Sequence, residues 1–174
     1  MILRAIQTFI KDPKPEASAD KVVSGLNVLD GLVRVTEPIR SPVRGVPCAA
    51  FFYRSFLYIP PKTPESPPGM HKIKEAEAYA SFTLEMEGGT VGVVPAKPGV
   101  FTQLEHRDLQ ERYGKFFQGV EETVLPGARV RVKGKVTVQG EEKTLVLKEL
   151  TLLEAQPRGA AGDGKRKKRK KSGK

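Results

Sequence analysis

Four cations alternate along one short segment and could contact phosphate groups: Arg129, Arg131, Lys133 and Lys135. In a β-strand this spacing places all four on one face, about 6.6 to 7 Å apart, which is close to the phosphate repeat of a nucleic acid single strand. Small barrels bind single strands by combining a basic groove with stacking aromatic rings. The rings available for this role are Phe51, Tyr53 and Tyr79. The alternative is a solvated face on which these cations pair across strands with acids such as Glu141, Glu142 or Glu149.

A second group of cations lies near the C-terminus, in the run KRKKRKK. Its members are Lys165, Arg166, Lys167, Lys168, Arg169, Lys170 and Lys171. Residues 158–174 carry nine Lys/Arg against Asp163, or +8, whereas residues 1–157 carry 21 Lys/Arg against 19 acids, or +2. We expect this tail to be disordered, because it repels itself and has no apolar residue to bury. It would attract nucleic acid and acidic lipid headgroups alike, at about 1 kcal/mol per cation near a membrane, although a merely solubilising tail is an alternative.

The residues that could support catalysis or bind metal are few. Cys48 is the single cysteine, and the two histidines are His71 and His106, too few for a structural zinc site. We interpret Cys48 as a buried thiol in a strand and His106 as an exposed helix residue. The carboxylate pairs 121–122 and 141–142 are interpreted as solvated turn charges, since adjacent strand residues point apart. We therefore expect no catalytic residue, no metal and no cofactor; an enzyme without a recognisable motif is an alternative.

Length and composition indicate one domain with tails. The chain has 174 residues, of which 39% are hydrophobic and 29% charged, as in a soluble globular protein. Its apolar runs are all well short of the roughly 20 residues that cross a bilayer, and a single cysteine fits a reducing cytoplasm. We divide the chain into an N-terminal segment and linker (1–24), a domain (25–155) and a basic tail (156–174).

The N-terminal segment has apolar residues at helix-like spacing. They are Ile2, Leu3, Ile6, Phe9 and Ile10. We interpret this segment as a docking helix, with a membrane-surface anchor as the alternative. Residues 11–24 contain Pro13 and Pro15 and are expected to form a linker.

The first half of the domain predicts two strands joined by a corner. Residues 26–35 form a strand bent at Gly31, because a glycine inside a strand usually marks a bulge or bend. Prolines and glycine make residues 38–47 a corner. A strand at 48–58 should be covered on both faces, since apolar residues occupy both of its alternating sets. Residues 59–74 hold five prolines and are expected to be a surface loop that cannot join a sheet.

The second half predicts a hairpin, a helix and two further strands. The hairpin turns at Gly88-Gly89, and the helix is expected near residues 102–118, starting with a Thr102–Glu105 capping box. The strands begin after Pro126-Gly127, with Val130, Val132, Val136 and Val138 inward, and end with residues 144–153. This order predicts a mainly β fold, a small OB-like β-barrel with one helix between its third and fourth principal strands.

Part of the chain resembles a known domain family. The run PIRSPVRGVPCAAFFYR, with Ser41-Pro42, Gly45 and Pro47-Cys48, is similar to the GIDE-type domain, also called the beside-a-membrane domain. The later run LPGARVRVKGKV, residues 125–136, is similar to the closing strands of that domain. The resemblance covers roughly residues 25–153.

The resemblance implies a partner-binding barrel often found near membranes. Mitochondrial members of the family place this domain between two transmembrane helices and follow it with a zinc-binding RING, which a chain with one cysteine cannot form, so ligase activity is not carried over. From the residues and the resemblance together we expect a non-catalytic interaction module, cytoplasmic or peripheral to a membrane, that binds an anionic partner. We favour nucleic acid as that partner, with a peripheral membrane-associated adaptor as the alternative and a protein partner also conceivable.

Overall fold

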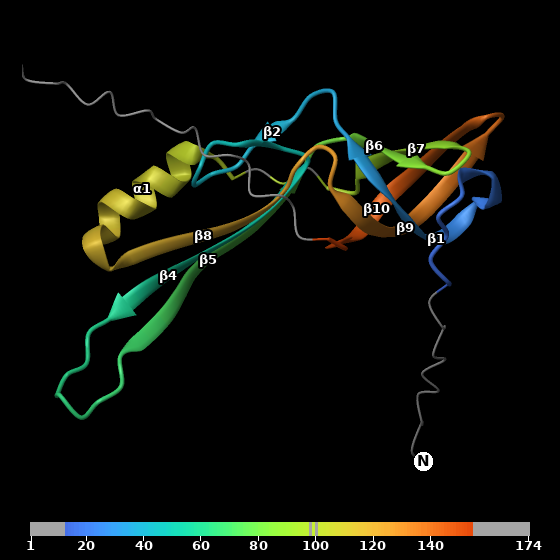
Figure 1. Cartoon of the computed structure of the whole chain (residues 1–174). Helices are drawn as coiled ribbons and strands as arrows, with labels where there is room; N and C mark the ends of the chain where they lie inside the picture. Colours follow the sequence, from blue (N-terminus) through green and yellow to red (C-terminus); the bar gives the residue numbers. More distant parts are fainter. Residues whose placement is uncertain (1–12, 98, 100, 155–174) are drawn as a thin grey trace, which may run out of the picture.

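Five strands close into a barrel in the computed structural model, which describes residues 13–97, 99 and 101–154. In spatial order they are β1 (Gly25–Arg34), β6 (Phe82–Met86), β7 (Gly89–Pro95), β10 (Glu142–Leu152) and β9 (Arg129–Gln139), which closes on β1 (Figure 1). β7 and β10 are parallel and the other neighbours are antiparallel. Numbered along the chain, the barrel strands follow the order first, second, third, fifth, fourth. The prediction of a mainly β fold with an OB-like barrel is confirmed.

The barrel core follows from the alternation of apolar residues. Val130, Val132 and Val136 of β9 are buried, as predicted, and so are Leu145 and Leu147 of β10. Leu29, Val33, Leu84, Val91 and Val93 complete the interior from the other three strands. Because each strand has one inward row, the closed barrel buries these rows without leaving a sheet edge.

Two glycines in β1 and β9 allow close approach of neighbouring strands. A Cβ on Gly134 would lie 2.1 Å from the Val146 carbonyl oxygen, and one on Gly31 would lie 2.6 Å from the Glu85 carbonyl oxygen. Next to Gly134, the β9–β10 pairing shifts register between Leu147 and Glu149. Glycine is thus required at these two positions by space inside a tightly curved barrel.

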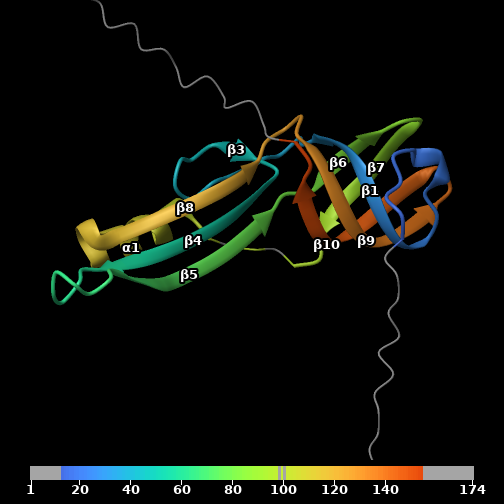
Figure 2. The same ribbon diagram turned by 60° about the horizontal axis from the view of Figure 1, so that its bottom comes forward.

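A second sheet of three strands projects from the barrel (Figure 2). It consists of β5 (Gly69–Tyr79), β4 (Ala50–Ile59) and β8 (Phe117–Val124), in this order and all antiparallel. The prediction that residues 48–58 form a strand is confirmed, but its assignment to the barrel is wrong. The chain inserts β4 and β5 between the first and second barrel strands, where periodicity alone does not identify the sheet that a strand joins.

The segment between β7 and β9 also differs from the prediction in part. Helix α1 (Gln103–Tyr113) begins with the predicted Thr102–Glu105 capping box. It ends before residue 118, because Gly114 has φ 59° and ψ −141°, backbone angles outside the helical region that glycine can adopt without a side-chain clash. A 3₁₀ turn, η2 (Gly114–Phe116), leads into β8, so Phe117 lies in a strand and not on the helix.

Two predicted connections are shorter than expected. Strand β5 starts at Gly69, so residues 69–74 join a sheet and only residues 60–68, which hold all five prolines, form the loop. Within the predicted linker, the Glu16 amide donates to the Val28 carbonyl at 2.8 Å, and Ala19 and Val22 are buried against the barrel around η1 (Ala19–Lys21). The corner is confirmed, with β2 (Ile39–Arg40) and β3 (Pro47–Cys48) pairing across it.

The N-terminal segment 1–12 and the tail 155–174, including the KRKKRKK run, lie outside the described residues. Among the helices of the part described, none is both long and apolar enough to cross a membrane.

Gly134 provides a test of barrel closure. Gly134→Ala should destabilise the protein by about 2 kcal/mol or more, because the added methyl group meets backbone that cannot move without opening the β9–β10 pairing. The matched control is Gly92→Ala in β7, where a Cβ would make an ordinary contact at 3.6 Å with the Lys143 carbonyl oxygen. Urea unfolding of both variants measures the difference; equal stabilities would contradict the close approach.

Candidate interaction site

The corner (residues 38–47) is attached to the second sheet by one carboxylate. Glu121 of β8 accepts hydrogen bonds from the Ser41 hydroxyl at 2.9 Å, the Val43 amide at 2.8 Å, and the Arg44 amide and Nε at 3.1 and 2.7 Å. The Glu121 side chain is only 2% exposed. The interpretation of residues 121–122 as solvated turn charges is therefore wrong for Glu121, which anchors the corner, whereas Glu122 is exposed.

The residues that carry the family resemblance shape this corner. Ser41 is fully buried, and its hydroxyl accepts a hydrogen bond from the Val46 amide while donating to Glu121. Gly45 has φ 68°, and its amide donates to the Ser41 carbonyl. The serine and the glycine thus fold the corner into a tight loop that presents amides to the carboxylate.

The environment of Glu121 determines its protonation. Burial alone would raise its pKa, but the hydrogen bonds from Arg44, the Val43 amide and Ser41 outweigh burial and hold the pKa below its ordinary value of 4.5. The carboxylate is consequently charged at neutral pH and balanced by the half-exposed Arg44 guanidinium.

Under the corner and α1 lies a second, smaller core. It contains Cys48, Phe51, Tyr53, Ala78 and Phe101. The buried thiol is confirmed, and burial, with a smaller effect of Glu121, raises the pKa of Cys48 to about 11, so this thiol is unreactive at neutral pH. His106 is half-buried instead of exposed: its Nδ1 lies 3.1 Å from the Tyr53 hydroxyl, and burial lowers its pKa.

Two of the three proposed stacking rings belong to this core. Phe51 is 1% exposed and Tyr53 is fully buried, stacked on Phe101 at 4.4 Å between ring centroids. Neither ring can stack on a base without unfolding the second sheet, which corrects that prediction. Tyr79 is half-buried beside Phe52, and its hydroxyl donates to Glu77.

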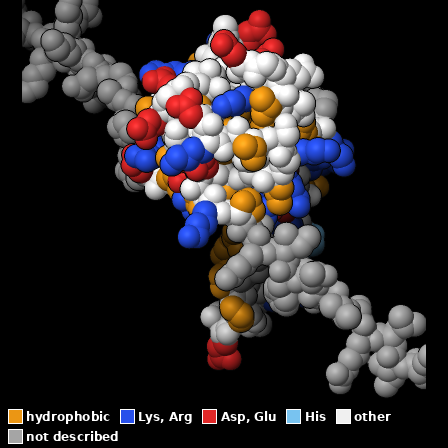
Figure 3. All heavy atoms as spheres, turned by 90° about the vertical axis from the view of Figure 1, so that its right-hand side faces the viewer, with side chains coloured by type: hydrophobic (Ala, Val, Ile, Leu, Met, Phe, Trp, Pro, Cys, Tyr) orange, Lys and Arg blue, Asp and Glu red, His pale blue; other side chains and the backbone are white. Residues whose placement is uncertain are grey.

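The β9 cations share the outer face of the barrel, as their spacing predicts, but acids lie among them. Arg131 makes two hydrogen bonds of 2.7 Å to Asp30 of β1. Lys133 lies 4.0 Å from Glu149, and Arg129 lies 3.8 Å from Glu154. The cross-strand pairing alternative therefore describes much of this row, although Glu141 and Glu142 lie at the distant β9–β10 turn. Figure 3 shows acidic and basic side chains interspersed on the barrel end.

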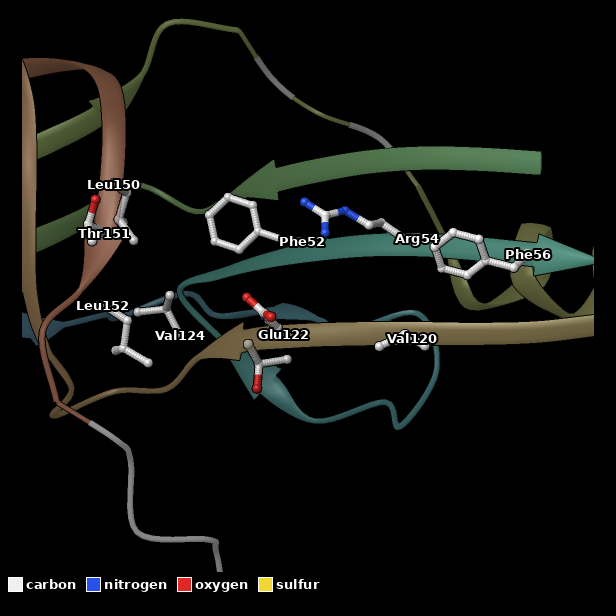
Figure 4. A pocket seen from close by; sticks show the side chains of 10 residues that line it. Phe52, Arg54, Phe56, Val120, Glu122, Val124, Leu150, Thr151 and Leu152 are labelled. Carbon is white, nitrogen blue, oxygen red and sulfur yellow. The ribbon is translucent and has the colours of Figure 1, made fainter. Parts of the chain in front are cut away.

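An apolar groove lies where the second sheet meets the end of β10. We call it the inter-sheet groove; its volume is about 490 Å³ (Figure 4). Its lining residues are Phe52, Arg54, Phe56, Val120, Glu122, Thr123, Val124, Leu150, Thr151 and Leu152. The sequence did not predict this groove, because β4 was assigned to the barrel and residues 119–124 of β8 were assigned to no element.

A second apolar surface lies at the tip of the second sheet, the end farthest from the barrel in Figure 1. We define this apolar tip as Tyr58, Ile59, Met70 and Phe116, which are between 37% and 58% exposed. Tyr58 pairs with Met70 across β4 and β5 and stacks on Phe116 at 6.4 Å, and Lys115 lies over the Phe116 ring at 5.2 Å. Because residues 59–74 were predicted to be a loop, the pairing of Met70 with Tyr58 was not expected.

Within the described residues, no group of three or more His, Cys, Asp or Glu side chains could hold a metal ion. Comparison of the chain with protein-family models, with curated proteins and with solved structures returns no match.

Glu121 allows a test of the corner. Glu121→Gln should destabilise the protein by about 2 to 4 kcal/mol, because the amide cannot accept from all the buried donors and leaves Arg44 without its charge partner. Glu122→Gln, one residue away and exposed, should change stability by less than about 0.5 kcal/mol.

The stability that Glu121 contributes should depend on pH. Since the folded-state pKa of Glu121 is lowered, its contribution is complete above the ordinary value of 4.5 and is lost as the pH falls through the folded-state value. The stability difference between wild type and Glu121→Gln, measured by urea unfolding, should therefore shrink on acidification below about pH 4.5. A difference that grows instead would contradict the assigned charge state.

Proposed function

We propose that this protein is a non-catalytic interaction module that lies at the periphery of an anionic membrane. The observation that carries this proposal is the apolar tip, where the ends of β4 and β5 and the η2 turn expose four large hydrophobic side chains near the Lys115 ammonium group. Clustered exposed apolar residues of this kind mark interaction surfaces more often than single exposed residues do.

Charge distribution supports a membrane with acidic headgroups. Residues 13–154 carry 19 Lys/Arg and 18 acids and are nearly neutral, whereas residues 158–174 carry +8. Reversible membrane binding becomes stable when an apolar anchor and a polybasic segment act together. The tip and the tail provide one of each, and the resemblance to a domain found beside membranes agrees with this division.

Met70 is the most exposed residue of the tip, at 58%, and offers the sharpest test. Met70→Glu should weaken binding of the full-length protein to vesicles containing phosphatidylserine roughly tenfold, since burying this side chain contributes about 1.5 kcal/mol or more. The measurement is vesicle co-sedimentation over a lipid titration at fixed salt.

Val146→Glu is the matched control, because Val146 is 42% exposed on the barrel and lies outside the tip. It should bind vesicles as wild type does. A chain ending at Gln156 should lose most of the salt-dependent affinity. If Met70→Glu and Val146→Glu bound equally well, the tip would not contact the membrane.

Single-stranded nucleic acid is the second candidate partner, and the shared outer face of the β9 cations favours it. Arg131 and Lys133 would both have to exchange a carboxylate for a phosphate, so the tail would supply most of the affinity. The folded part of the chain therefore supports a membrane partner better than a nucleic acid partner.

A salt series distinguishes the two candidates. If the β9 face binds single strands, the double variant Arg131→Ala/Lys133→Ala in a chain ending at Gln156 should bind an oligonucleotide more weakly and with a salt slope smaller by about 2. Lys143→Ala/Lys148→Ala removes the same charge from β10 and is the control. Equal binding by both double variants would exclude the β9 face as the nucleic acid site.

A further inference from the structure

The two faces of the three-stranded sheet have different surroundings. One face carries Phe51, Tyr53 and Glu121 and is covered by α1, the corner and Phe101. The opposite face carries Phe52, Phe56 and Val120, and no element of residues 13–154 lies over it at the inter-sheet groove. Figure 4 shows these side chains together with Leu150 and Leu152 around the groove. This face also carries Arg54 and Glu122, so only its apolar part at the groove calls for a further layer.

The groove specifies the chemistry of that layer. Its lining is mostly apolar, with Arg54 and Glu122 as the two charged residues, and Glu75 and Glu77 lie across β4. Arg54 is already paired with Glu75 at 3.0 Å. The groove therefore suits a short helix with an apolar stripe that carries no acidic residue.

The chain carries such a segment next to the groove. Pro13 and Pro15 border a hollow that is also lined by Thr151, and Thr151 lines the inter-sheet groove as well. The twelve residues before Pro13 thus start beside the groove. As an extended chain they reach up to about 40 Å, and ten of them as a helix span about 15 Å, enough to lie along the bare face.

We propose that residues 2–10 form an amphipathic helix that packs into the inter-sheet groove and completes the second sheet as a layer. The apolar stripe Ile2, Leu3, Ile6, Phe9 and Ile10 faces Phe52, Val120 and Leu150. At 3.6 residues per turn, Arg4 and Lys11 lie on the side of such a helix away from the stripe, so their charges stay in solvent. The segment is then an intramolecular partner and not the membrane anchor, which the apolar tip provides.

Tryptophan fluorescence tests this docking, because the natural chain contains no tryptophan. In full-length Phe9→Trp the emission should lie at short wavelength and be protected from acrylamide. Adding Val120→Glu, which puts a charge on the bare face, should shift the emission to long wavelength and remove the protection. Adding Val146→Glu on the barrel should change neither property. Long-wavelength emission of Phe9→Trp alone would overturn the proposal.

The emission of Phe9→Trp also distinguishes other occupants of the inter-sheet groove. Emission that shifts with protein concentration would show that a second copy fills the groove, and emission that becomes short only with anionic vesicles would show a membrane anchor; both results overturn intramolecular docking. A failure of membrane binding, by contrast, would leave the fluorescence result unchanged.

A disulfide provides an independent readout. The double variant Phe9→Cys/Val120→Cys should oxidise within one chain, detected by mass spectrometry of the monomer, whereas Phe9→Cys/Val146→Cys should not. Cys48 does not interfere, because it is fully buried and its pKa is about 11. A bond formed only between chains, or at equal rates in both variants, would contradict docking in the groove.

Discussion

The buried carboxylate of Glu121 is the interaction on which the covered side of the second sheet depends. Four hydrogen bonds converge on it from the corner, which has almost no regular pairing of its own beyond two residues in each of β2 and β3. A buried charge with fewer donors would cost several kcal/mol, so the corner and β8 stabilise each other only when both are in place. The fixed corner in turn covers Cys48, and α1 closes the same core through His106.

Strand β4 connects the two cores of the molecule. Ala50, at its start, is buried in the barrel core, whereas the next residue, Phe51, is buried in the smaller core under the corner. Ala49 and Ala50 have small side chains, so the backbone at the start of β4 can lie close to the barrel core. Its two alternating rows then separate, with Phe51 and Tyr53 toward α1 and Phe52 and Phe56 toward the inter-sheet groove. The barrel and the second sheet are therefore joined by a strand that contributes to both cores.

The sequence predicted the parts of this fold that depend on local pattern and missed those that depend on pairing. Alternation identified the inward rows of β9 and β10, and the Thr102–Glu105 spacing identified the start of α1. Periodicity could not show that residues 48–58 leave the barrel, because a strand with two apolar rows suits either sheet. Strand β8 was not predicted, because its first two residues continued the helix pattern and residues 119–124 were assigned to no element. Asp30 was not expected to face Arg131, since this contact depends on the register of β1 against β9.

That register also decides how the β9 cations contribute to binding. Exposed ion pairs contribute little to stability, typically below about 1 kcal/mol, yet a phosphate approaching Arg131 still meets the Asp30 carboxylate, bound at 2.7 Å, as a competing and repelling anion. Lys133 is shielded further, because its side chain is only 15% exposed. The folded part therefore attracts an anionic surface weakly, and the tail alone supplies a large field. The second sheet adds two apolar surfaces to this weakly charged part, and they follow one another along β4, since Phe56 lines the groove and Tyr58, two residues later, belongs to the tip.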